Sequence, residues 1–166
     1  SESLDAYTWL QQENRLTAHI AATIVAEADN DVQPQIQMLR SLQNRYKGTD
    51  LHILGFKIFA DGVIEHPTHT ASLSLPYTDT KNAGVLMFDP LKFAAFSTAA
   101  DKAGLLVHVH AIGDRAVTET LNGFEQARKK NGNYKLPHTI THMQIVQPAD
   151  FSRFKSLHVL ASLQLL

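Results

Sequence analysis

Three polar residues, Lys57, His110 and His142, each interrupt an apolar run that is typical of a buried parallel strand. A turn or the start of a helix follows each of them within a few residues, so they belong near the carboxyl ends of the predicted strands. Open α/β sheets and α/β barrels carry their binding and catalytic groups at these ends. The three residues are therefore the first candidates for a functional site.

Lys57 lies in the apolar run LHILGFKIF. A lysine inside a buried strand is unfavourable unless it is paired, neutralised or chemically modified. One interpretation is a side chain that reaches the rim of the sheet and keeps its ammonium in water. The other is a lysine carbamylated by carbon dioxide, whose carboxylate-like oxygens would bind a metal. Imidazole nitrogen and carbamate oxygen together suit zinc, manganese or iron better than calcium.

His110 ends the run LLVHVH, just before a Gly-Asp corner and a helical pattern. His142 lies in TITHMQIV, where strand alternation predicts Ile140, His142 and Gln144 on one face. Either histidine could instead be a core residue whose ring is hydrogen-bonded to a neighbour. His108 shares a face with His110, so a His-x-His metal pair is an alternative. Because His108 lies deeper in the strand, we predict that it is not a metal ligand.

Other residues that could do chemistry have simpler explanations. His66 and His69 fall in a long segment rich in turn residues, where solvated histidines are the expected case. Asp61 and Asp114 are expected to serve as a turn residue and a helix N-cap. His138 flanks a strand and carries no pattern of its own. The sequence contains no glycine-rich phosphate loop, no G-x-S-x-G motif and no H-E-x-x-H motif.

Helices and strands are predicted to alternate along the chain, which is typical of a parallel α/β sheet with helical crossovers. The chain has 166 residues, whereas a complete (β/α)8 barrel rarely takes fewer than about 200. It is therefore either a small open α/β domain or part of a barrel. The predicted helices are 4–12, 34–46, 90–103, 114–130 and 148–157, and the predicted strands are 16–26, 51–59, the run from Leu105 to His110, 139–146 and 158–163.

Composition excludes several classes of function. The formal net charge is −1 with no basic stripe, so nucleic acid is not an expected partner. The absence of cysteine excludes disulfides and thiolate metal sites. No apolar run approaches the roughly 20 residues of a membrane helix, so no membrane partner is expected. The first residues do not resemble a signal peptide. The cellular location stays open, with the cytoplasm as first choice.

Five short blocks occur in an order that resembles a known family. They are Lys57–Gly62 (KIFADG), Thr70-Ala71 with Pro76-Tyr77, His110–Val117 (HAIGDRAV), Thr141–Gln144 (THMQ) and Ala161–Gln164 (ASLQ). Together they resemble the YtcJ-like branch of the metal-dependent amidohydrolase superfamily, which includes N-substituted formamide deformylases and proteins named as exoenzyme regulators. Two departures stand out: Leu165-Leu166 follows Gln164 where the family continues Gln-Pro-x-His, and His138 replaces a common arginine, a change expected to bear only on substrate contacts.

The resemblance implies that residues 1–166 form about strands three to seven of a (β/α)8 barrel. Lys57, His110 and His142 would then be the metal ligands on strands four, five and six, with the lysine carbamylated where two metals are bridged. The family's His-x-His on strand one and aspartate on strand eight have no counterpart here. The implied reaction is hydrolysis of a carbon–nitrogen bond, outside peptide linkages, in a small amide or cyclic amide.

The implied cofactor is a divalent metal, with zinc as first choice, in the full-length protein. The chain alone is expected to be inactive, to bind metal weakly or not at all, and to self-associate through its outer strands. The alternative is a non-catalytic α/β protein that keeps the fold and binds a ligand or a partner.

Overall fold

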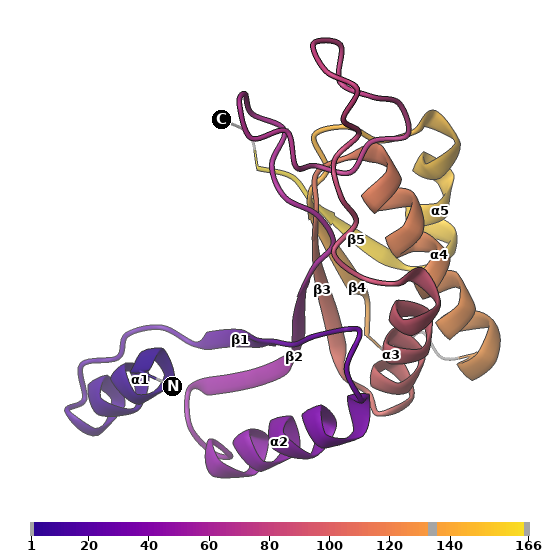
Figure 1. The fold of residues 1–166 in the computed structure, drawn as a ribbon. Helices are drawn as coiled ribbons and strands as arrows, with labels where there is room; N and C mark the ends of the chain where they lie inside the picture. Colours follow the sequence, from indigo (N-terminus) through magenta and orange to yellow (C-terminus); the bar gives the residue numbers. More distant parts are fainter. Residues whose placement is uncertain (1, 133–135, 165–166) are drawn as a thin grey trace.

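The computed structural model describes residues 2–132 and 136–164, and five parallel strands form its centre. The strands lie in the order in which they occur along the chain, which confirms the predicted parallel α/β class. Figure 1 shows this sheet with α3, α4 and α5 on one side of β3, β4 and β5. The strands are β1 (Ile20–Val25), β2 (Leu51–Phe59), β3 (Leu106–Ala111), β4 (His138–His142) and β5 (Val159–Ser162).

Helices join successive strands, as the alternating pattern predicts. The helical elements are α1 (Glu2–Gln12), α2 (Val32–Arg45), α3 (Pro90–Lys102), α4 (Asp114–Asn131), the 3-10 turn η1 (Pro148–Asp150) and α5 (Phe151–Ser156). The predicted strand 139–146 is wrong in its second half, because β4 ends at His142. None of the helices in the described residues is long and apolar enough to cross a membrane.

Local sequence explains where α3 begins, and only partly where α4 begins. The Asp89 carboxylate accepts hydrogen bonds from Leu91 and Lys92, as expected of an N-cap followed by proline. The predicted N-cap role of Asp114 is wrong. Gly113 is the N-cap of α4 and Asp114 is its first helical residue, with its carboxylate turned to Ser74 instead.

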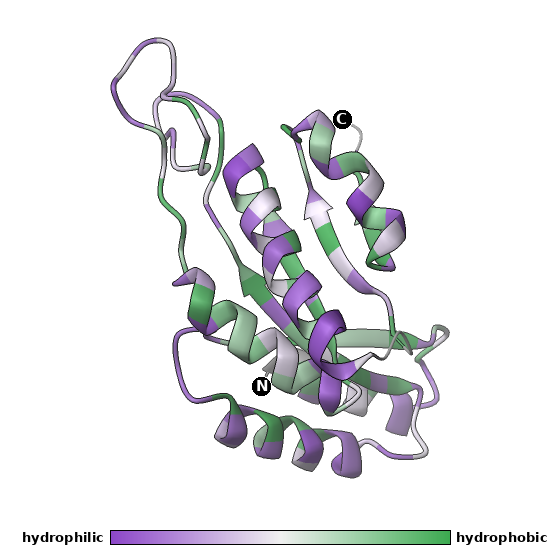
Figure 2. Cartoon of the chain, turned by 90° about the vertical axis from the view of Figure 1, so that its right-hand side faces the viewer, coloured by the Kyte–Doolittle hydropathy of each residue, from purple (hydrophilic) through white to green (hydrophobic). Residues whose placement is uncertain are grey.

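The core lies between the sheet and the helices that cover it. Phe56 of β2 packs edge-on against Phe96 of α3, with ring centroids 5.2 Å apart, and both side chains are buried. In Figure 2 the outward side of α4 is mostly hydrophilic, whereas the strands behind it are hydrophobic. On the opposite face of the sheet, Leu54 and Phe59 of β2 are exposed among the described residues.

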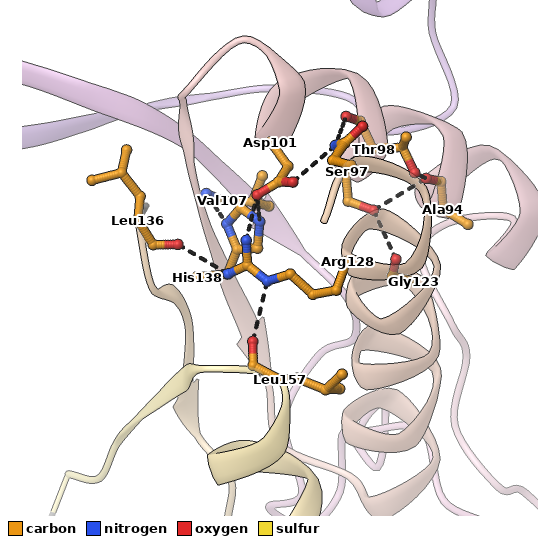
Figure 3. A network of polar contacts seen from close by, with 11 residues as sticks. Ala94, Ser97, Thr98, Asp101, Val107, Gly123, Arg128, Leu136, His138 and Leu157 are labelled. Carbon is orange, nitrogen blue, oxygen red and sulfur yellow. Dashed lines mark hydrogen bonds and ion pairs between the residues drawn. The ribbon is translucent and has the colours of Figure 1, made fainter. Parts of the chain in front are cut away.

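A buried polar network ties α3, α4 and β4 together at the amino end of the sheet (Figure 3). Arg128 Nη1 lies 2.5 Å from Asp101 Oδ1, and both side chains are almost fully buried. His138 Nδ1 accepts from the backbone N–H of Val107, and its Nε2 lies 3.2 Å from Asp101 Oδ1. Arg128 also donates to the carbonyl of Leu157. The prediction that His138 bears on substrate contacts is wrong, because it lies in this network at the far end of β4 from His142.

This network makes stability depend on pH. Burial lowers the pKa of His138 below 6.5, so the folded state keeps the ring neutral. An unfolded histidine takes up a proton near pH 6.5. The contribution of His138 to the free energy of unfolding is therefore complete above about pH 7 and is lost as the pH falls. We expect urea unfolding to give a lower free energy at pH 5.5 than at pH 7.5. In the His138→Gln variant the free energy of unfolding should fall less between pH 7.5 and pH 5.5. An equal fall in the variant and the wild type would contradict this assignment.

Candidate metal centre

Lys57 reaches the open face of the sheet because β2 contains a bulge. In the pairing of β1 with β2, Ala22 pairs with Ile53, but the next residue, Thr23, pairs with Gly55. Leu54 is therefore the extra residue, and the alternation of β2 reverses after it. Without this reversal, Lys57 would share the buried face of Ile53.

Gly55 permits a close approach of β2 to β3 directly after the bulge. A Cβ at this position would lie 1.9 Å from the carbonyl oxygen of Leu106. No side chain fits there, so the glycine allows the two strands to pair beside the bulge. The Lys57 ammonium then lies 5.3 Å from the centre of the Phe59 ring, towards the carboxyl end of β2.

His110 lies on the same face of the sheet, on β3, two residues further towards the carboxyl end than the level of Lys57. Lys57 pairs with His108 in the sheet register, and Phe59 pairs with His110. His110 Nε2 lies 2.9 Å from the carbonyl oxygen of Gly62. A carbonyl oxygen can only accept, so Nε2 carries the proton and Nδ1 of the neutral ring keeps its lone pair. Nδ1 is thus the atom of His110 that could bind a cation.

His142 joins this site through an unusual backbone conformation. Its φ is +78° and that of Met143 is +49°, both in the left-handed region that side chains other than glycine seldom adopt. Such conformations cost about 1–3 kcal/mol each and gather at functional sites. The prediction that Ile140 and His142 share a face is wrong: Ile140 is fully buried, whereas the His142 ring meets the His110 ring edge-on at 4.6 Å.

The structure thus brings Lys57, His110 and His142 to one face at one end of the sheet. Their role as metal ligands stays a prediction. In the described part of the chain, no three His, Asp or Glu side chains form a group that could hold a metal ion. The site offers two imidazoles, and a third ligand would come from Lys57 only if its amine were converted into a carbamate. That donor set suits a transition metal such as zinc.

Burial and mutual repulsion lower the pKa values of Lys57, His108 and His142 and so disfavour their protonated forms. Burial lowers the pKa of Lys57, and no carboxylate among the described residues raises it again. Burial, the Lys57 ammonium and His142 lower the pKa of His108 to about 4. Burial lowers the pKa of His142 in turn, and His110 and Lys57 lower it further. Neutral imidazoles and free amines are the forms that bind metals or react with carbon dioxide.

Asp61 is the residue whose importance the sequence patterns did not reveal. It is not a simple turn residue, because its buried carboxylate accepts from the backbone N–H groups of Ser72, Ile112 and Gly113. Burial raises its pKa, although these three bonds and His110 oppose that change. The only sequence signal is its place inside the block KIFADG, two residues beyond the end of β2.

The predicted long segment between β2 and α3 is confirmed, and it rises above the carboxyl ends of the strands (Figure 1). A second carboxylate holds it: Asp114 accepts from the backbone N–H and the hydroxyl of Ser74. Within the segment, the buried His69 ring stacks on Tyr77 with centroids 4.3 Å apart, so the expectation of a solvated His69 is wrong. The segment is therefore tied to the start of α4 through Ser74 and contains a packed pair of rings of its own.

A cavity of about 500 Å³ opens beside His110. Its size is in the range of pockets for small molecules. Its walls are mostly apolar, and Phe59, Val63 and Met87 are all exposed at its rim. The Phe59 ring centre lies 5.4 Å from that of His110, so one wall of the cavity borders the candidate metal centre.

Comparison with known proteins places this arrangement in a family. Residues 1–166 match the model of the Amidohydrolase family. The chain belongs to this family. It is 29% identical over 157 residues to the exoenzymes regulatory protein AepA of Pectobacterium carotovorum, a match that covers 95% of this chain and 33% of that protein. It is 38% identical over 115 residues to the protein LONG AFTER FAR-RED 3 of Arabidopsis thaliana, covering 69% of this chain and 19% of that protein.

A solved structure shows the same fold. An uncharacterized metal-dependent hydrolase from Pyrococcus furiosus superposes with a TM-score of 0.75 at 31% sequence identity. The match covers 99% of this amidohydrolase chain and 32% of the archaeal one. The chain thus spans from about a fifth to a third of the length of these relatives.

Proposed function

We propose that the protein, at full length, is a metal-dependent hydrolase of carbon–nitrogen bonds other than peptide bonds, with a small amide or cyclic amide as substrate. The observation that carries the proposal is the placement of Lys57, His110 and His142 on one face, at one end of the sheet, in a member of the amidohydrolase family. A closed (β/α)8 barrel, of which residues 1–166 would form a part, belongs to the same proposal.

Each of the three residues has a distinct task in this proposal. His110 would bind the metal through Nδ1, since its Nε2 proton is directed to the carbonyl of Gly62. His142 would bind beside it, held by its left-handed backbone. The Lys57 amine would attack carbon dioxide and release one proton, which leaves a carbamate with two oxygen donors. A divalent metal, with zinc as first choice, would activate water and polarise the substrate carbonyl.

The cavity beside His110 would receive the substrate. The described lining carries two carboxylates, Asp61 and Glu27, and no cationic side chain. The Asp61 oxygens already accept three backbone hydrogen bonds. The remaining walls favour an uncharged, partly apolar amide over an anionic one.

One relative favours a second candidate function. AepA is named as a regulatory protein, so a non-catalytic member that binds a ligand at the strand ends is the alternative. Both functions can be tested on the full-length protein by elemental analysis and by hydrolysis of linear amides, cyclic amides and matched esters. Bound metal and chelator-sensitive amide hydrolysis would support the hydrolase. Ligand binding without metal or turnover would support the alternative.

The chain of 166 residues should by itself be inactive and bind zinc only weakly. Its site presents two imidazoles and a lysine that can serve as a ligand only as a carbamate, whereas structural zinc sites normally have four protein ligands and catalytic ones three. The measurement is zinc bound after dialysis against bicarbonate, together with amide hydrolysis. Tight stoichiometric zinc with turnover near that of the full-length protein would contradict this prediction.

The same chain should self-associate through its outer strands. β1 and β5 form the edges of the sheet, and Val25 and Leu160 on them are 60% and 53% exposed. Exposed edge strands with apolar side chains readily pair with other chains. Sedimentation velocity over a range of concentrations should show oligomers, and substitution of Val25 and Leu160 by lysine should reduce them. A concentration-independent monomer would refute the idea.

A further inference from the structure

Asp61 connects three segments at the candidate metal centre. It lies two residues beyond the end of β2, and its side chain is completely buried. Oδ1 accepts from the backbone N–H of Ile112 at 2.9 Å, and Oδ2 accepts from Gly113 at 2.8 Å and from Ser72 at 2.9 Å. One carboxylate thereby fixes the end of β3 and the segment above it to the end of β2.

The same carboxylate lies beside the His110 ring. Oδ1 is 3.6 Å from His110 Nε2, the nitrogen that also contacts the carbonyl of Gly62. A negative charge next to this nitrogen favours the tautomer with the proton on Nε2. Ile112 and Gly113 follow His110 closely in the chain, so the bonds to them also fix where the ring stands.

We propose that Asp61 is a positioning residue for His110: it holds the histidine in place with Nε2 protonated and leaves Nδ1 free for a metal ion. The inference rests on the proposed function, because it gives His110 a ligand role. Three backbone N–H groups donate to the Asp61 carboxylate, and the His110 Nε2 lies 3.6 Å from Oδ1. An asparagine has one acceptor oxygen, and its amide N–H groups would face backbone N–H groups that need an acceptor. It therefore cannot replace the aspartate.

Asp114 supplies a matched control for this proposal. Its carboxylate also accepts a backbone N–H, from Ser74 at 2.9 Å, and it also accepts a side-chain bond from Gln147. It therefore holds the same segment as Asp61, two residues further along. Its contacts run to Ser74 and Gln147 and not to the His110 ring. A residue that acts only by holding the segment should behave as Asp114 does.

The experiment compares D61N and D114N in the full-length protein. Hydrogen exchange by mass spectrometry over residues 70–74 reports how firmly the segment is held. Competition with a chelator reports zinc affinity, and kcat and KM report turnover of an amide. We expect faster exchange in both variants. Only D61N should lose zinc affinity by about 10–100-fold, the usual effect of removing a group that orients a metal-binding histidine. Its kcat should fall while KM changes little.

Two outcomes would overturn the proposal: wild-type zinc affinity in D61N, or equal losses of zinc affinity in D61N and D114N. If D61N does not fold, D61E keeps the charge but moves the oxygens by one methylene group, and the same comparison applies to it. Zinc affinity tests the proposal even if no amide is hydrolysed. Failure of the hydrolase function can therefore be distinguished from failure of the role of Asp61.

Discussion

His110→Asn and His142→Asn should each strip the metal from the full-length protein, whereas His108→Asn should leave the metal content nearly unchanged. His110 and His142 meet ring to ring at the carboxyl end of the sheet, whereas His108 lies one pair deeper, level with Lys57. Loss of a group that only orients a ligand costs about 10–100-fold in metal affinity. Loss of a ligand itself should therefore exceed about 100-fold.

Elemental analysis after gel filtration measures this effect, and circular dichroism checks that each variant is folded. His108 is a demanding control, because its Nε2 is buried without a hydrogen-bond partner in the described structure. A buried ring nitrogen without a partner is also what a metal ligand would show before the metal binds. Equal metal loss in His108→Asn and His110→Asn would reverse the assignment and make the His-x-His pair the metal site.

Asp101→Asn should lower the free energy of unfolding by about 3–5 kcal/mol, which is the typical result of leaving one partner of a buried ion pair uncompensated. Arg128 and Asp101 are 1% and 4% exposed at their side chains. Without the carboxylate, the buried guanidinium loses a charged partner, and the carbonyl oxygens of Leu136 and Leu157 that also accept from it carry no compensating charge. His138 loses its charged neighbour as well.

Urea unfolding of both proteins at pH 7.5 measures the difference. Lys129→Gln serves as the control, because the Lys129–Glu125 pair is as short, at 2.6 Å, but the lysine side chain is 72% exposed. Exposed pairs contribute about 1 kcal/mol or less. If Asp101→Asn were no more harmful than Lys129→Gln, the buried network would not be a main source of stability.

The position of His142 shows where periodicity fails. Alternation alone extends β4 to about Val146 and keeps His142 on the face of Ile140. In the structure, two successive left-handed residues end the strand at His142 and turn its ring to His110. Neither residue is a glycine, so the sequence gives no sign of this conformation. It is maintained by contacts from β3, including the bond from the Met143 N–H to the Ala111 carbonyl.

Short-range sequence patterns do not reveal the structural roles of Asp61 and His138, for a related reason. Each occupies a position that is common for its residue type, a turn and a strand end. The roles of Asp61 come from partners 11 to 52 residues away, and the role of His138 includes a hydrogen bond from Val107, 31 residues away. Short-range patterns carry no information about such contacts.

The sequence by itself determined the parallel α/β class, the existence of all five strands, the long segment before α3 and the choice of Lys57, His110 and His142 as candidates. These follow from local hydrophobic patterns, from turn residues and from the unfavourable burial of a charged side chain, all of which act over a few residues. The tertiary structure decided which way the candidates face. A one-residue bulge at Leu54 determines which face of the sheet carries the Lys57 side chain, and a left-handed backbone determines the direction of the His142 ring. The Asp61 carboxylate links the end of the His110 strand to the segment above it. Each depends on strand pairing or hydrogen bonds between distant segments, which form only when the chain is folded.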